Sequence, residues 1–459
     1  MTSAPLPGRT ADSAYAWWRL VVTLGLMTVG SSAMYVVAVV LPAVQAEFAV
    51  GRSEASIPYT LLMIGFGFGG ILMGRLADRF GVTVPLFIGA AGLGLGFGAA
   101  ALAPNIWLFA LAHGIGLGLF GCSATFAPLV ADTSLWFVRR RGIAVGICAS
   151  GNYLAGAVWP PIVQHLVETS GWRTAYGVLA VVCAVTLPLL ALALRPRPPA
   201  AVAAPVEGAA ASGPASASTA SSALAQRSGQ PFGLPLGRAQ ALLCVAGLAC
   251  CVAMSMPQVH IVAYCGDLGY GAARGAQMLS LMLAFGVVSR LISGLICDRI
   301  GGLRTLLLGS VLQGVALLLF IPFDSMTSLF IISAMFGLFQ GGIVPSYAII
   351  VREYFPPAEA GARVGTVLMF TMLGMALGGW MSGQVFDWTG SYTAAFVNGL
   401  AWNLLNLTIV ITLWRRSRRW RPGDATPQRA GPPSAPASRG NRRIRRPAPG
   451  PRYRPGHPR

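Results

Sequence analysis

Residues 74–81 read Gly-Arg-Leu-Ala-Asp-Arg-Phe-Gly, and residues 294–301 repeat the pattern as Gly-Leu-Ile-Cys-Asp-Arg-Ile-Gly. In both copies glycine, aspartate, arginine and a second glycine stand at the same spacing. Each copy follows a long apolar run, and the two copies lie 220 residues apart in a chain of 459. The repeat therefore predicts two related halves joined head to tail.

The composition around these copies is strongly apolar. Hydrophobic residues make up 55% of the chain and charged residues 10%, with a mean hydropathy of +0.65, whereas soluble domains carry about 25% charged residues. The chain is thus not expected to be a water-soluble globular protein. The glycines and prolines follow no three-residue period and sit among long apolar runs, which excludes collagen-like and disordered chains. A polytopic membrane protein is indicated.

The apolar runs predict the number of membrane crossings. A spanning helix needs about 20 mostly apolar residues, and continuous runs favour helices over barrel strands of alternating polarity. We predict an all-α membrane protein with twelve transmembrane helices in two pseudo-symmetric halves of six. The predicted spans are 20–44, 57–73, 82–103, 107–130, 142–163, 175–194, 239–263, 275–297, 306–321, 328–351, 364–386 and 392–413.

The arginines predict how the chain is oriented. All 33 basic residues are arginine, and 29 of them fall in the two ends of the chain and the even-numbered loops. The opposite loops hold only Arg52, Arg173 and Arg274, and Arg290 falls inside a predicted span. The positive-inside rule then places both termini in the cytoplasm. The first run is long and lacks a cleavage motif, so we expect a retained helix and no signal peptide.

Three segments outside the spans complete the predicted organisation. Residues 1–18 form a cytoplasmic N-terminal segment before the first half, 19–194. Residues 195–238, rich in Ala, Pro and Ser, form a flexible cytoplasmic linker before the second half, 239–413. Residues 414–459 form an Arg-rich disordered tail that attracts anionic lipid headgroups. We do not expect the tail to bind nucleic acid.

The repeated motif resembles the signature loop of the major facilitator superfamily, and the second copy falls where that family places it. The resemblance covers residues 19–414. Within the superfamily, the stretch 136–142 (WFVRRRG) leading into Gly151-Asn152-Tyr153, together with Arg290 ahead of Gly294, is similar to the oxalate/formate antiporter and monocarboxylate transporter branch.

The resemblance implies that the signature loops control the swing between outward-facing and inward-facing states. Charges at the cytoplasmic face pair with each other and with helix ends without deep desolvation, which favours a gating role over substrate binding. The alternative is that these residues only fix the topology. The matching positions are Gly74, Asp78, Arg79, Gly81, Gly294, Asp298 and Arg299.

Arg290 is the predicted substrate ligand. It lies eight residues before Asp298, or about 12 Å along a helix, in a hydrocarbon core about 30 Å thick, where an arginine costs about 3 kcal/mol. All 14 Asp and Glu residues are predicted to lie in loops, tails or helix ends, so the substrate would be the counterion. A guanidinium matches a carboxylate with two parallel hydrogen bonds. The alternative is that the side chain extends to the interface or to Asp298.

Two departures from the branch narrow the expected chemistry. The oxalate exchanger carries a second base in its eleventh helix, but residues 364–386 contain no Lys or Arg, so a dicarboxylate is not expected. Some monocarboxylate carriers place an acid where this chain has Gly286, and the first predicted span has no charge. His113 is the remaining candidate for proton coupling, because imidazole titrates near neutral pH; the alternative is a neutral packing residue.

Polar residues inside the spans are the candidates for lining a substrate cavity, although such residues also bridge helices structurally. These candidates are Tyr35, Asn152, Tyr153, Gln258, Gln340 and Tyr347. The eight cysteines lie in apolar segments and resemble small buried residues, with the spacing of neither a disulfide framework nor a metal site. No catalytic triad or nucleotide loop is present, so we expect no enzyme activity, cofactor or metal.

The sequence therefore predicts a secondary active transporter of the inner membrane. It would move a small, monocarboxylate-like organic anion by alternating access, as proton symport or as anion exchange. The alternative is proton-coupled efflux of drugs or of another neutral small molecule. We expect the carrier to be a monomer.

Overall fold

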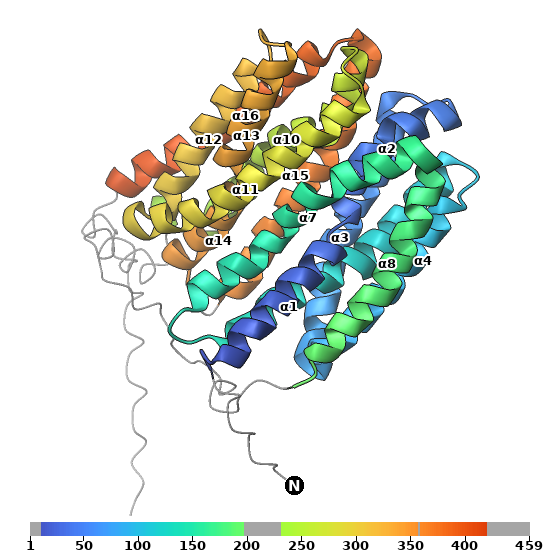
Figure 1. Ribbon diagram of the computed structural model, residues 1–459. Helices are drawn as coiled ribbons and strands as arrows, with labels where there is room; N and C mark the ends of the chain where they lie inside the picture. Colours follow the sequence, from blue (N-terminus) through green and yellow to red (C-terminus); the bar gives the residue numbers. More distant parts are fainter. Residues whose placement is uncertain (1–10, 197–230, 357–358, 420–459) are drawn as a thin grey trace, which may run out of the picture. The chain divides into compact units, whose positions relative to one another are not determined.

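The computed structural model describes residues 11–196, 231–356 and 359–419, which form helices and no strands (Figure 1). Within these ranges, twelve helical segments are long and apolar enough to cross a membrane, which confirms the predicted fold class. The chain is therefore a multi-pass membrane protein. In Figure 1 the blue-to-green helices of the first half run beside the yellow-to-red helices of the second half.

The first half contains six spans, two of which are interrupted. The first span is α1 and α2, and the fourth is α5, the π-helix η1, the short 3-10 helix η2 and α6. The bounds are α1 Ala14–Gly30, α2 Ala33–Phe48, α3 Arg52–Phe80, α4 Thr83–Ala101, α5 Ile106–Leu111, η1 Ala112–Gly121, η2 Cys122–Thr125, α6 Ala127–Trp136, α7 Arg141–Ser170 and α8 Trp172–Ala193.

The second half repeats this plan, with one interrupted span made of α13 and α14. A 3-10 turn, η3 (Pro231–Gly233), precedes it. The bounds are α10 Leu236–Asp267, α11 Ala272–Ile300, α12 Gly302–Leu319, α13 Met326–Gln340, α14 Ile343–Tyr354, α15 Ala360–Thr389 and α16 Tyr392–Arg419.

The two copies of the motif end α3 and α11 in the same geometry. Gly81 has φ of +85° and Gly301 has φ of +84°, a region of backbone conformation that favours glycine. Each donates its N–H to the carbonyl four residues earlier, Gly81 to Ala77 and Gly301 to Cys297, both at 2.8 Å. The glycine that closes each copy thus stops the second helix of its half.

The helices are longer than the charge-free runs predicted. The second span was predicted as 57–73, whereas α3 starts at Arg52 and continues to Phe80. A run bounded by charges ends at the first charged residue, but a helix ends where its backbone can be capped or turned. The extra turns carry charged residues into the bundle.

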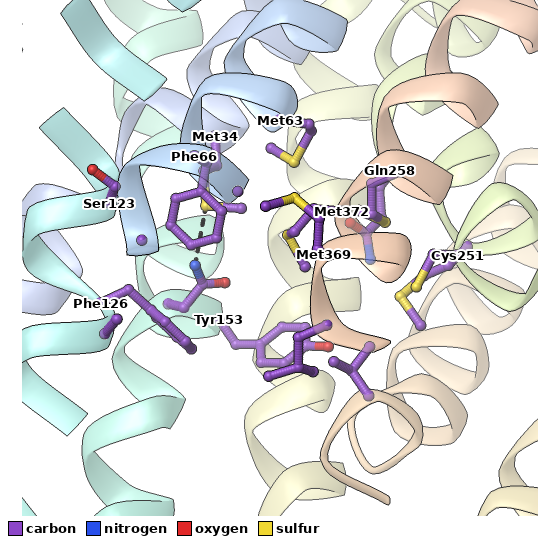
Figure 2. Close-up of a pocket in the computed structure, with 18 of the residues that line it drawn as sticks. Met34, Met63, Phe66, Ser123, Phe126, Tyr153, Cys251, Gln258, Met369 and Met372 are labelled. Atoms are coloured by element: carbon purple, nitrogen blue, oxygen red, sulfur yellow. Dashed lines mark hydrogen bonds between the residues drawn. The ribbon is translucent and has the colours of Figure 1, made fainter. Parts of the chain in front are cut away.

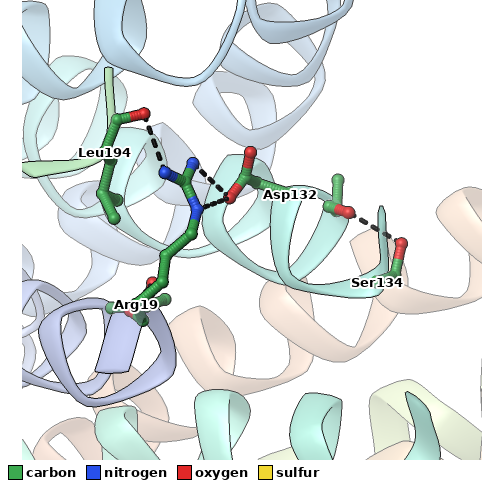
Figure 3. A network of polar contacts seen from close by, with 6 residues as sticks. Arg19, Asp132, Ser134 and Leu194 are labelled. Atoms are coloured by element: carbon green, nitrogen blue, oxygen red, sulfur yellow. Dashed lines mark hydrogen bonds and ion pairs between the residues drawn. The ribbon is translucent and has the colours of Figure 1, made fainter. Parts of the chain in front are cut away.

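One such charge corrects the prediction that Arg290 is the only arginine inside a span. Arg19, in α1, is 2% exposed and forms an ion pair of 2.8 Å with Asp132 of α6, which is 8% exposed. Its Nε also donates to Asp132, at 3.2 Å, and its Nη1 donates to the Leu194 carbonyl, at 3.0 Å (Figure 3). The Trp136 ring lies 4.7 Å from the guanidinium carbon. Arg19 is therefore neutralised within the first half.

The predicted linker, 195–238, and tail, 414–459, fall largely outside the described residues. What the structure shows of them is that α10 begins at Leu236, before the predicted span, and that α16 continues to Arg419. The eight cysteines are free and buried.

Candidate functional site

A cavity of about 340 Å³ lies between the two halves. The first half contributes residues of α2, α3, η2, α6 and α7, and the second half contributes residues of α10, α11, α14 and α15. Figure 2 shows Phe66 and Phe126 of the first half on one side and Gln258 and Cys251 of the second half on the other. Both halves would have to move relative to one another to change access to this space.

Arg290 lines the cavity, and it is the only charged residue that does so among the described residues. Its Nη1 donates to the Ala149 carbonyl of α7, at 2.9 Å, and its Nε donates to the Gly341 carbonyl, at 3.4 Å. The guanidinium carbon lies 4.5 Å from the centre of the Tyr153 ring. No carboxylate within the described ranges pairs with it.

The interruption between α13 and α14 helps to place Arg290. Gly341 stands in this break, so its carbonyl is available to the guanidinium. Its N–H donates to the Ser289 hydroxyl oxygen at 3.1 Å. A Cβ on Gly341 would collide with the backbone of α11. The glycine therefore lets the broken tenth span approach the helix that carries Arg290.

The repeat relates Arg290 to Gly70, and both residues line the same cavity. A Cβ added to Gly70 would meet no atom within 4 Å. The position equivalent to Arg290 in the first half is thus open space, so the cavity carries its charge on one half only.

Tyr35 and Asn152 also line the cavity and form a pair across α2 and α7. The Tyr35 hydroxyl donates to Asn152 Oδ1 at 2.6 Å, and Asn152 Nδ2 contacts the sulfur of Met34 at 3.1 Å (Figure 2). Tyr153, the next residue, supports Arg290. These three predicted residues are therefore brought together with Arg290.

The remaining polar candidates divide between the cavity and the interior of the second half. Gln258 lines the cavity and donates to Gln340 Oε1 at 2.9 Å. Gln340 lies behind it, fully buried, and Tyr347 donates to Asn406 at 3.0 Å. Neither Gln340 nor Tyr347 is among the residues that line the cavity, so both have the positions of helix-bridging groups.

His113 is buried in an aromatic cluster away from the cavity lining. Its Nδ1 donates to the Phe109 carbonyl at 2.8 Å, which leaves Nε2 to accept from the Tyr176 hydroxyl at 3.0 Å. A neutral imidazole satisfies both bonds. The packing alternative for His113 thus has support that the proton-coupling prediction lacks.

At the end of the bundle opposite the signature loops, three charged residues join the halves. Arg52, at the start of α3, pairs with Asp267 of α10 at 3.0 Å. The Asp387 carboxylate of α15 accepts from the backbone N–H groups of Arg52 and Ser53, both at 2.8 Å, and from the Ser53 hydroxyl at 2.6 Å. We call Arg52, Ser53, Asp267 and Asp387 the latch.

The predicted gating residues at the other end make no comparable contacts. Asp78, Arg79, Asp298 and Arg299 are exposed, and none has a hydrogen bond or ion pair to another described residue. Gly74 and Gly81 likewise have no atom within 4 Å of an added Cβ, and the same holds for Gly294. Among the described residues, hydrogen bonds and an ion pair of the latch therefore link the two halves at one end, whereas the charged residues of the signature loops form no such link at the other end.

The latch and most of the cavity lining were not predicted. Arg52, Asp267 and Asp387 are 335 residues apart at the extremes, and the packing of α3 and α10 against α15 brings them together. Six methionines line the cavity. Three of them recur every third residue on α15, a spacing that marks one helix face and is the one signal the sequence offered. They are Met34, Met63, Met254, Met369, Met372 and Met375.

Comparison with known proteins gives a consistent picture. A family model described as the Major Facilitator Superfamily matches residues 21–327 and 291–449. Monocarboxylate transporter 13 of Bos taurus is 30% identical over 348 residues, which cover 75% of this chain and 77% of that protein. The MFS-type transporter opdF of Penicillium oxalicum is 26% identical over 66% of each chain.

Among solved structures, a bacterial homologue of the human lysosomal transporter Spinster, in an inward-facing and unoccupied conformation, aligns with a TM-score of 0.65. The alignment covers 89% of this chain and 99% of the other, at 13% sequence identity. At that identity the likeness establishes the fold alone.

Proposed function

Because the chain belongs to the Major Facilitator Superfamily, we propose that it is a secondary active transporter that moves a monocarboxylate-like organic anion by alternating access. The relationship to a monocarboxylate transporter supports the substrate class. A cavity shared by two halves supports the mechanism, since a central site between repeats is the plan of such carriers.

The observation that carries the proposal is that Arg290 has no carboxylate partner among the described residues. The Arg19 and Arg52 side chains, which are buried, each have a carboxylate partner, and Arg290 is partly buried. Arg290 lines the cavity with only carbonyl and aromatic neighbours. Carbonyl oxygens carry partial charge, so the full positive charge is left for an anion to neutralise. Nη2 takes part in neither of the hydrogen bonds that Arg290 makes to the Ala149 and Gly341 carbonyls, and it is our candidate donor to a carboxylate.

We further propose that the signature loops lie in the cytoplasm of a cell with an inner membrane, together with both termini. The arginine distribution supports this orientation. The latch would then close the periplasmic side, and the present structure would be open toward the cytoplasm. Asp78 and Asp298, with their neighbouring arginines, would form contacts in the opposite state.

The coupling is proposed as either proton symport or anion exchange. We place no proton step on His113, because both of its ring nitrogens are hydrogen bonded inside the first half. The chain would act as a monomer, with anionic lipids near its Arg-rich end.

A second candidate is efflux of a neutral, apolar small molecule, which the apolar lining of the cavity favours. Apart from Arg290 the lining consists mainly of aliphatic, aromatic and methionine side chains with a few uncharged polar groups. In that case Arg290 would only tie α11 to α7 and to Gly341. The two candidates differ in whether the cargo must carry a negative charge.

Flux into proteoliposomes tests the proposal. Arg290→Gln should reduce carboxylate transport about 100-fold, because losing one partner of a buried charge pair costs about 2–5 kcal/mol. Arg274→Gln, an exposed arginine on the same helix, is the matched control and should transport normally. Organic acids should raise the melting temperature of the wild type and not of Arg290→Gln. Equal carboxylate flux in wild type and Arg290→Gln would refute the anion site.

A further inference from the structure

The methionines of the cavity carry information about the cargo beyond its charge. Six of the 15 methionines in the chain line this one space. Their thioethers are flexible and polarizable and make favourable contacts with the edges of aromatic rings. A wall built this way adapts to a bulky apolar group.

Two phenylalanines of the first half line the cavity together with the methionines of α15. Phe66 and Phe126 pack edge to face with 5.8 Å between their ring centres. Figure 2 shows Met369 and Met372 across the cavity from these rings, with Met63 nearby. The space is therefore bordered by phenyl rings and thioethers from the first half and by thioethers from α15 of the second half.

The size of the cavity argues against a very small cargo. About 340 Å³ reaches the lower end of the roughly 300–1,000 Å³ typical of pockets for drug-sized ligands. A two- or three-carbon acid on Arg290 would leave apolar walls facing trapped water, which is unfavourable. A cargo that fills the space excludes that water.

The polar groups of the cavity limit the cargo to one charge. Arg290 is the only charged lining residue in the described part of the chain, and the repeat-related position is Gly70. Two of its five N–H groups are used by the Ala149 and Gly341 carbonyls. The three that remain suffice for one bidentate carboxylate and are too few to bind a second in the same way.

We infer that the cargo is an aromatic monocarboxylate, with its carboxylate on Arg290 and its ring between the phenylalanines of the first half and the methionines of α15. The inference rests on the proposed function and adds the substrate class. A rigid ring suits this space better than a flexible alkyl chain, because fewer rotors are immobilised on binding. The carrier would thus select its cargo by one charge and one apolar body.

Competition for uptake in wild-type proteoliposomes tests the inference without any variant. Phenylacetate, 3-phenylpropionate and indole-3-acetate should bind at least tenfold more tightly than lactate. Octanoate, succinate and the neutral phenylacetamide should be poorer than phenylacetate. If lactate or octanoate equals or exceeds phenylacetate, the inference is wrong, while an Arg290-dependent flux of those acids would keep the proposed function. If phenylacetamide is transported as fast as phenylacetate, or if no acid is transported, the inference and the proposed function are both wrong.

A methionine variant locates the ring. Met369→Ala with Met372→Ala should weaken phenylacetate binding at least about fivefold more than it weakens lactate binding. Met381→Ala, a partly buried methionine on the same helix that does not line the cavity, is the control and should behave as wild type. An equal effect of the double variant on both acids would contradict the assigned position of the ring. Melting temperatures of all three proteins show that each is folded.

Discussion

Arg19 and Arg290 are both inside membrane-spanning helices, yet only Arg19 has a carboxylate partner among the described residues. Arg19 has a carboxylate, a carbonyl and an indole ring around it, and it is almost completely buried. Arg290 has two carbonyls and a phenol ring, and it borders a cavity. The difference teaches that charge inside the bundle is not by itself a sign of function. We propose that a binding residue is marked by a charge inside the bundle whose counterion the described residues do not supply.

Removing the partner of Arg19 should have the largest effect. Asp132→Ala leaves a guanidinium buried and unpaired, and breaking such a pair costs about 3–5 kcal/mol. We expect a large fall in the melting temperature of the purified protein, with transport per folded molecule preserved. Replacing both residues, as Arg19→Met with Asp132→Leu, should recover much of the stability, because an apolar pair needs no counterion.

The outcome of these variants also sharpens the comparison. If Asp132→Ala melts as wild type but no longer transports, the Arg19–Asp132 pair belongs to the transport cycle and the contrast with Arg290 disappears.

Giving the cavity a second unpaired arginine is the next test. Gly70→Arg places a cation at the position related to Arg290 by the repeat, where an added side chain meets open space. We expect the ratio of dicarboxylate to monocarboxylate flux to rise about tenfold, the effect of about 1.4 kcal/mol. Gly146→Arg, also in open space but not lining the cavity, should leave the ratio unchanged. A monocarboxylate preference that survives in Gly70→Arg would show that charge count does not set selectivity.

Arg52 of the latch differs from both arginines, because its carboxylate partner, Asp267, belongs to the other half. Asp387→Asn weakens the acceptor of three hydrogen bonds to Arg52 and Ser53, each net worth about 1 kcal/mol. The population of molecules separated at this end should rise about fivefold. Distances between spin labels at Ser170 and Ser325, exposed residues of the two halves near the latch, would report it.

A control for the latch lies at the N-terminal cap of α15, at the opposite end of the helix from Asp387. Glu359→Gln breaks the pair of Glu359 with Arg363, four residues along the chain, and joins no halves. The label distances should stay as in wild type. A similar shift in both variants would mean that charge loss on α15, and not the latch, moves the halves.

Asp12 is the anionic counterpart of Arg290, since its carboxylate accepts hydrogen bonds from backbone groups of the described residues, and its replacement should have the smallest effect. Its carboxylate accepts from the N–H groups of Arg139 at 3.0 Å and Val138 at 3.2 Å. The hydrogen bond from Arg139 is the main cause that lowers the pKa of Asp12 below its ordinary value. A lowered pKa stabilises the fold at neutral pH, and this stability is lost as the pH falls through the lowered pKa.

Asp12→Asn should therefore reduce the stability at pH 7 by less than about 0.5 kcal/mol, because the group is largely exposed. Melting curves should show the difference shrinking as the carboxyl of the wild type is protonated. A difference that grows in acid would contradict this role of Asp12.

The sequence predicted the spans and the two halves because hydropathy and the repeated motif are local signals. It predicted Arg290 because that residue interrupts an otherwise apolar run. Arg19 and Asp132 were missed because each stands just beyond the end of its charge-free run, where the helix continues. Arg19 and Asp132 are 113 residues apart in the sequence. Their ion pair and the contacts of the latch depend on how the helices pack, which cannot be predicted from a single sequence by local patterns.

The cavity lining was predicted in part for the same reason. Tyr35, Asn152, Tyr153 and Gln258 line the cavity with Arg290, whereas Gln340 and Tyr347 lie behind it. Polar residues inside a span are equally suited to a cavity and to a bridge between helices. The face that each residue presents is settled only by the neighbouring helices.

The hydrogen bond from Arg290 to Ala149 has a kinetic consequence. The donor belongs to α11 and the acceptor to α7, so the guanidinium that would receive an anion also fastens the two halves to each other. A carboxylate that binds Nη2 neutralises the guanidinium and so weakens its charge-assisted hydrogen bond to Ala149, whereas an unloaded carrier keeps that bond at full strength. We expect loaded molecules to reorient faster than empty ones. Cargo supplied on the opposite side of the membrane should therefore accelerate the return of the carrier to its starting conformation.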